Sequence, residues 1–151
     1  MGREKNRRRT FMKKYKILPH PAELRLRIYG KTLEELFINA AFALAETLKP
    51  DANLRIDANA AKEKIKIQSI DLNSLLVDFL SEILAKSQIN KKVYKVKSLK
   101  LKVIKNRADL EAEIAGILVE RFDEDIKAVT YQDVNIHLKP KTLNLKPKRW
   151  Q

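Results

Sequence analysis

The first regular pattern in the chain is an alternation of apolar and polar residues over positions 22–29. Apolar residues occupy the even positions, and the odd positions are polar or charged. A period of two is typical of a strand with one buried and one solvated face. Pro19 and Pro21 separate this strand from a short apolar-containing run at Tyr15–Leu18, and Gly30 ends it. The pattern therefore predicts two short strands near the beginning of the chain.

The pattern changes to a helical period directly after Gly30. Thr32 and Glu35 have the spacing of a capping box, in which the hydroxyl and the carboxylate each accept from a backbone amide near the helix start. Apolar residues then follow the three- and four-residue spacing of an amphipathic helix from Leu33 to Leu48. Pro50 cannot continue a helix. The sequence therefore predicts a helix that ends before Pro50.

A second helix and further strands are predicted beyond this point. Asp71 can cap a helix whose apolar residues run from Leu72 to Ile83. The phase of alternation changes near Ser98, which predicts a β-bulge or a bend there. The strand-like segments are residues 62–69, 91–107, 108–114, 126–138 and 142–146.

This order of elements predicts an α+β fold. Most of the strands follow one another after the second helix, which favours antiparallel pairing over alternating strands and helices. We expect a mostly antiparallel or mixed sheet of about seven strands with two main helices packed on it. The predicted organisation is a flexible basic arm at 1–14, a single domain at 15–146 and a basic tail at 147–151.

Charge is unevenly distributed along the chain. The net charge of the 151 residues is +13, of which residues 1–14 carry +6 and residues 139–151 carry +5. Basic arms on a nearly neutral body favour a polyanionic partner, RNA or tRNA first, although solubilising tails have the same composition. Met12 is a second candidate start, and removal of residues 1–11 still leaves +9.

A second basic stretch lies inside the predicted domain. Residues 91–107 contain eight Lys or Arg and no acid, and the next strand carries Asp109, Glu111 and Glu113. Adjacent strands of opposite charge predict cross-strand pairing, which accounts for the lysines without a ligand.

The composition argues against several classes of protein. Without cysteine, disulfides and thiolate chemistry are excluded. With two histidines and three scattered glycines, neither a nucleophilic triad nor a phosphate-binding loop is indicated. No apolar run is long enough to span a membrane, and residues 1–9 do not resemble a secretory signal. We expect a cytoplasmic protein without membrane association and without catalytic activity of its own.

Three stretches in fixed order resemble the archease family. The first runs from Tyr15 through His20-Pro-Ala-Glu23 and Gly30-Lys-Thr-Leu-Glu-Glu35 to Ala41, and is similar to the strand and helix start of that family. The second is Asp71–Leu84. The third, Ile126-Lys-Ala-Val-Thr-Tyr131, is the most diagnostic short match. The resemblance implies a non-enzymatic protein that promotes guanylylation and turnover of a GTP-dependent RNA ligase in tRNA splicing and RNA repair. The alternative is a basic RNA-binding module on the same fold without a ligase-activating role.

The resemblance also implies a divalent metal site, often for calcium. Its metal-binding aspartates correspond here to Glu23 and Asn144, with the carbonyl of Leu145 as a further oxygen and His20 as possible support. Glutamate moves the carboxylate outward, and asparagine removes one negative charge. Because calcium affinity depends on ligand charge and rigidity, we expect metal binding to be weak or absent.

Overall fold

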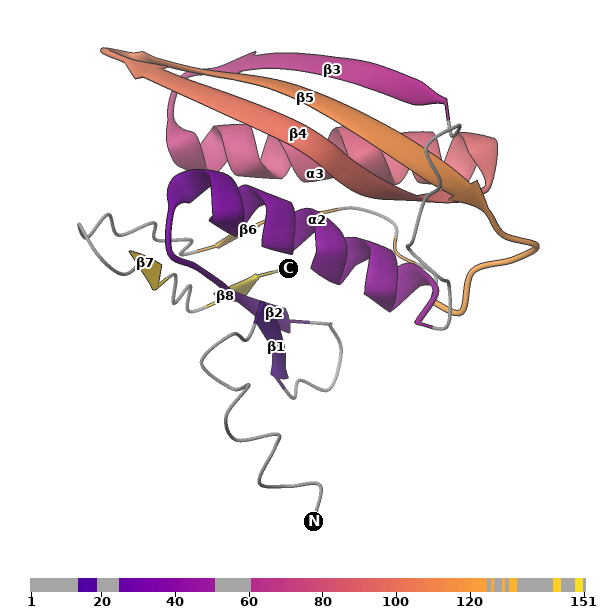
Figure 1. Ribbon diagram of the computed structural model, residues 1–151. Coiled ribbons are helices and arrows are strands. Elements are labelled where there is room, and N and C mark those ends of the chain that lie inside the picture. The colour runs from indigo at the N-terminus through magenta and orange to yellow at the C-terminus, as the bar shows by residue number, and fades with distance from the viewer. Residues whose placement is uncertain are drawn as a thin grey trace.

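The computed structural model describes residues 14–18, 25–50, 61–124, 126, 129, 131–132, 143–144 and 149–150 (Figure 1). Its helices are α2 (Leu33–Leu48) and α3 (Leu72–Asn90). The strands are β1 (Tyr15–Leu18), β2 (Arg25–Gly30), β3 (Lys62–Ser69), β4 (Lys92–Ile104), β5 (Arg107–Leu118), β6 (Tyr131–Gln132), β7 (Leu143–Asn144) and β8 (Arg149–Trp150).

Helix α2 lies at the centre of the described structure. Antiparallel strands in the order β3-β5-β4 pack with α3 on one side of it, and β1 and β2 lie on its other side (Figure 1). Ten of the residues in α2 are buried, and they cover most of its circumference. A helix buried on this scale needs a layer of structure on each side, and the two groups of strands supply it.

The predicted single sheet of about seven strands is wrong, although the α+β class and the two main helices are confirmed. The described strands form separate small sheets in the orders β1-β2-β7, β3-β5-β4 and β6-β8. The reason is the central position of α2, which separates the first two strands from β3-β5-β4. Alternation along a strand predicts which face is buried, but it does not predict which other strand lies alongside.

Both predicted helix starts are confirmed. The Thr32 hydroxyl accepts from the Glu35 amide at 3.0 Å, and the Glu35 carboxylate accepts from the Lys31 amide at 2.6 Å. The Asp71 carboxylate accepts from the Ser74 amide at 2.8 Å. These bonds satisfy backbone donors that have no partner within the helix, so each helix begins at the predicted residue.

The strands β4 and β5 form a long hairpin that projects beyond the helices (Figure 1). Its register shifts between Val96 and Ser98, which confirms the predicted bulge. Asn106, in the turn, has a φ of 62°, a left-handed conformation that asparagine tolerates better than most residues. Within the described ranges, neither helix is long and apolar enough to cross a membrane.

Candidate functional site

The junction between β2 and α2 is built around a close backbone approach. Gly30 ends β2, and a Cβ atom added there would lie 2.5 Å from the amide nitrogen of Leu36. The only residue that fits without moving this backbone is therefore glycine. The strand and the first turn of α2 are held in contact here, next to the capping box of Thr32 and Glu35.

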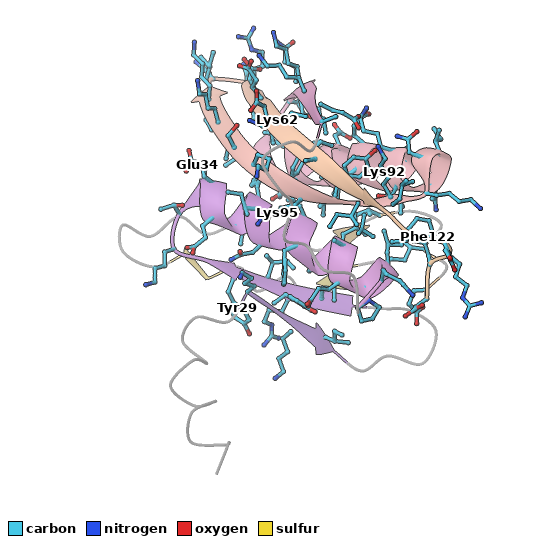
Figure 2. All side chains as sticks on the ribbon, turned by 45° about the vertical axis from the view of Figure 1, so that its right-hand side comes forward. Tyr29, Glu34, Lys62, Lys92, Lys95 and Phe122 are labelled. Carbon is cyan, nitrogen blue, oxygen red and sulfur yellow. The ribbon has the colours of Figure 1, made fainter. Side chains whose placement is uncertain are left out.

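A buried amide side chain attaches the end of β2 to the middle of α2. Asn39 is 5% exposed, and its Nδ2 donates to the backbone carbonyl of Tyr29 at 2.7 Å. Tyr29 pairs in turn with Asn144 of β7. Figure 2 shows Tyr29 on the strand that runs beside α2. Asn39 therefore holds the strand position against which the C-terminal segment pairs.

The first strand is attached to the same helix by its aromatic side chain. The Tyr15 hydroxyl donates to the Glu46 carboxylate at 2.6 Å, and its ring meets Phe42 edge-on with centroids 6.4 Å apart. Lys14 places its ammonium 4.7 Å from the centre of the Phe42 ring, within the range of a cation–π contact. Burial, followed by the hydrogen bond and the negative charge of Glu46, raises the pKa of Tyr15 far above its usual value.

The predicted metal positions fall at or beyond the limits of the described structure. The backbone of Asn144 pairs with Tyr29, whereas His20, Glu23 and Leu145 lie outside the described residues. In the part of the chain that the structure describes, no three His, Asp or Glu side chains gather as a metal-binding group. The assignment of a metal to these positions stays a prediction, as does the division into arm, domain and tail.

The stretch with the most diagnostic family resemblance is anchored to α3, and the chain just before it is anchored to the end of α2. The Gln88 side chain of α3 donates to the carbonyl of Ile126 at 2.6 Å, and Val129 is buried in the core. Just before it, Asp123 donates its amide to the last carbonyl of α2, at Leu48, and pairs with Lys49 at 3.1 Å. The chain is thereby held against the C-terminal end of α2.

The acidic row of β5 and the lysines opposite it lie on the face of the sheet away from α3, whereas Glu63 of β3 pairs with Lys86 of α3 at 3.2 Å. Lys66 and Lys100 flank Glu111 from the two outer strands, and Lys102 lies opposite Asp109. The register therefore confirms that the basic strand lies beside the acidic strand. Among the described residues, however, no lysine of β4 forms an ion pair with Asp109 or Glu111, which pair with Arg107 and Lys64 instead. Lysines are also in excess: residues 62–69 and 92–118 hold ten basic and four acidic residues, which gives +6.

These charged rows border a groove of about 550 Å³. Every residue that lines it comes from β3, β4 or β5 and none comes from a helix, which places the groove on the outer face of the sheet. Nitrogen-tipped side chains gather around the far end of the β4–β5 hairpin (Figure 2). The groove is a basic surface inside the folded domain, separate from the predicted arms.

Two of these structural features were not predicted from the sequence. Asn39 was overlooked because it falls among the apolar residues of α2, although a polar residue on a buried helical face is itself a signal for an internal hydrogen bond. The groove was overlooked because the lysines that line it come from β3 and β4, which are distant in the sequence.

Comparisons with known proteins agree on one family. Residues 15–146 match the model of the Archease protein family (MTH1598/TM1083). The chain is 34% identical over 131 residues to the protein archease of Methanosarcina barkeri, covering 82% of this chain and 86% of that protein. It is 31% identical over 136 residues to the protein archease of Pyrococcus furiosus, covering 85% and 92%. The solution structure of Methanobacterium thermoautotrophicum protein 1598 superimposes with a TM-score of 0.70 and 25% identity, covering 87% of this chain and 94% of that one.

Proposed function

The chain belongs to the archease family, and from that premise we propose that it is an accessory protein of a GTP-dependent RNA ligase in tRNA splicing or RNA repair. In this role it promotes guanylylation of the ligase and its return to activity after each ligation. The ligase carries out the chemistry, and this chain contributes binding. The observation that carries the proposal is the family match over residues 15–146, which includes all three stretches of sequence resemblance.

The described structure supports this proposal through the segments that the family shares. The β2–α2 junction and the start of α3 are held by specific hydrogen bonds, Ile126 accepts a hydrogen bond from Gln88, and Val129 is buried. These contacts hold the described parts of the family's stretches in place. A preorganised surface loses little conformational entropy when it binds a partner, which suits a protein that acts by binding.

The test is reconstitution with the ligase from the same genome. Purified ligase is incubated with labelled GTP, with and without this chain, and both the guanylylated ligase and the number of ligations per enzyme are measured. We expect the chain to increase both quantities. A substitution at an exposed position outside the three family-like stretches, Glu120→Ala, serves as the control variant and should retain the effect. An unchanged ligase in the presence of the wild-type chain would refute the proposed function.

The second candidate is an RNA-binding module on the same fold. The excess of lysine on the β3-β5-β4 sheet and the basic ends of the sequence favour it. Tight RNA binding by the isolated chain, retained in Glu23→Ala, together with no effect on the ligase, would favour this function over the first.

A further inference from the structure

Three large aliphatic side chains are exposed at one end of the β3-β5-β4 sheet. Ile70, Val103 and Ile104 are 73%, 57% and 41% exposed. Ser69 and Val103 both lie opposite Ala108, from the two sides of β5, so the three side chains belong to the same end of the sheet. Two of them lie on the β4–β5 hairpin, which extends beyond the helices (Figure 1). Exposed aliphatic side chains gathered in this way are typical of an interaction site.

The basic groove adjoins these aliphatic side chains. Ile104 follows Lys102 by two residues on β4 and therefore shares its face of the sheet, and Lys66 and Lys100 lie on either side of Glu111 on that face. Val103 lies opposite the buried Ala108 and so belongs to the other face, where it is still 57% exposed at the hairpin end. Among the described residues, no carboxylate lies within ion-pair distance of Lys66, Lys100 or Lys102, whereas Lys64 lies 3.9 Å from Glu111 and Arg107 3.2 Å from Asp109. Glu111 and Asp109 are therefore paired with Lys64 and Arg107, and the three ammonium groups of Lys66, Lys100 and Lys102 are available to an external anion.

We propose that this end of the sheet, formed by the six residues Lys66, Ile70, Lys100, Lys102, Val103 and Ile104, is a docking surface for a protein segment with acidic residues beside apolar ones. The acidic groups would meet the lysines of the groove, and the apolar groups would cover the aliphatic side chains at the hairpin end. This inference rests on the proposed function in one respect: the partner that presents the segment is the ligase.

Two observations favour a protein segment over RNA as the occupant. The first is that none of the six residues is aromatic, so the surface lacks the stacking partners that proteins use to bind single-stranded bases. The second is the exposed aliphatic group of Ile70, Val103 and Ile104 near the lysines, because apolar side chains of a protein segment can cover it and a phosphate backbone cannot.

The experiment measures binding of the full chain to the purified ligase by fluorescence anisotropy. One variant, Lys100→Glu with Lys102→Glu, reverses charge in the groove, and a second, Val103→Ser with Ile104→Ser, removes the aliphatic side chains. Matched controls lie at the opposite end of the same sheet: Lys62→Glu with Lys95→Glu for charge, two exposed lysines that flank Ala115, and Leu118→Ser, 71% exposed, for the aliphatic side chains. Thermal unfolding of every variant is measured to check that the fold is retained.

We expect each docking-surface variant to weaken ligase binding about tenfold or more, which is about 1.4 kcal/mol, and the controls to change it less than about threefold. Wild-type binding with undiminished binding of both docking-surface variants would overturn the inference and leave the proposed function standing. No binding by the wild-type chain would overturn both. Loss of affinity for a single-stranded oligoribonucleotide in the charge-reversed variant, with ligase binding retained, would overturn the inference in favour of RNA.

Discussion

The Asn39 side chain donates a hydrogen bond of 2.7 Å to the backbone carbonyl of Tyr29, the residue that pairs with Asn144. The buried amide of Asn39 therefore links α2 to β2 at the residue of β2 that pairs with β7. The resemblance assigns Asn144 to the family's metal-binding region, so Asn39 would position that region without binding a ligand itself.

Removal of this amide should destabilise the protein. Asn39→Ala leaves the partly buried carbonyl of Tyr29 without its donor, and we expect a loss of about 1 kcal/mol or more in the free energy of unfolding. Asn39→Asp should cost more, because it also buries a charge. Urea unfolding measures both variants, with the exposed Glu34→Ala on the same helix as the control. Equal stability of Asn39→Ala and the wild type would show that the hydrogen bond to Tyr29 contributes nothing.

A methyl group at the β2–α2 junction should also be destabilising. Gly30→Ala places a Cβ atom 2.5 Å from the backbone nitrogen of Leu36, which requires the helix and strand to separate, and we expect a loss of about 1–3 kcal/mol or more. Gly116→Ala is the comparison, because its Cβ atom would meet side-chain atoms, of Lys92 at 2.7 Å and of the Tyr94 ring at 2.8 Å, and no backbone atom as closely. Thermal unfolding should place Gly30→Ala below Gly116→Ala, and the reverse order would contradict this account.

Loss of the phenolic proton of Tyr15 should lower the stability of the protein at alkaline pH. Its pKa in the folded protein is raised above the ordinary value of 10.0 by burial and by Glu46. The unfolded chain therefore loses the phenolic proton first, and the contribution of Tyr15 is complete below about pH 10 and declines as the pH rises further. Tyr15→Phe should be less stable at neutral pH and lose less stability above pH 10. If the free energies of unfolding of the two proteins change in parallel from pH 8 to 11, the proposed contribution of Tyr15 is contradicted.

Divalent metal binding is expected to be weak or absent. Glu23 and Asn144 provide one negative charge where the family pattern has two, and a site with fewer negatively charged ligands binds calcium more weakly. Calorimetric titration with calcium tests this expectation. A site of about millimolar affinity or tighter that disappears in Glu23→Ala would contradict it. Asn144→Asp should create or strengthen binding, and if it does not while Glu23→Ala abolishes binding, Asn144 is not the ligand position.

If the basic arm contacts phosphate, the affinity for RNA should depend on the salt concentration through these contacts. Each phosphate contact on a single strand contributes about 0.7 to the slope of log affinity against log salt. Deletion of residues 1–11 removes five cations and should lower the slope for RNA, or for a ligase–RNA complex, by a few units at most. An unchanged slope after the deletion would show that this segment does not contact RNA.

Local features of the fold were predictable from the sequence because their causes lie within a few residues. The capping box joins Thr32 to Glu35, and the bulge at Ser98 follows from a change of phase within one strand. The pairing of basic and acidic strands was also predictable, since the two strands are consecutive and a short turn joins them. Family membership was recognisable from the order of three stretches and is confirmed over residues 15–146.

By itself, then, the sequence determined the two helices, the alternating strands, the distribution of charge and the family, all of which depend on periodicity, capping or residue order. Only the tertiary structure decided how the strands divide between separate sheets around α2, why Gly30 must be glycine, and that Asn39 holds the strand beside Asn144. It also placed Lys66 across Glu111 from Lys100. These relationships join residues that are distant along the chain, and they form only when burial of α2 brings its neighbouring layers together.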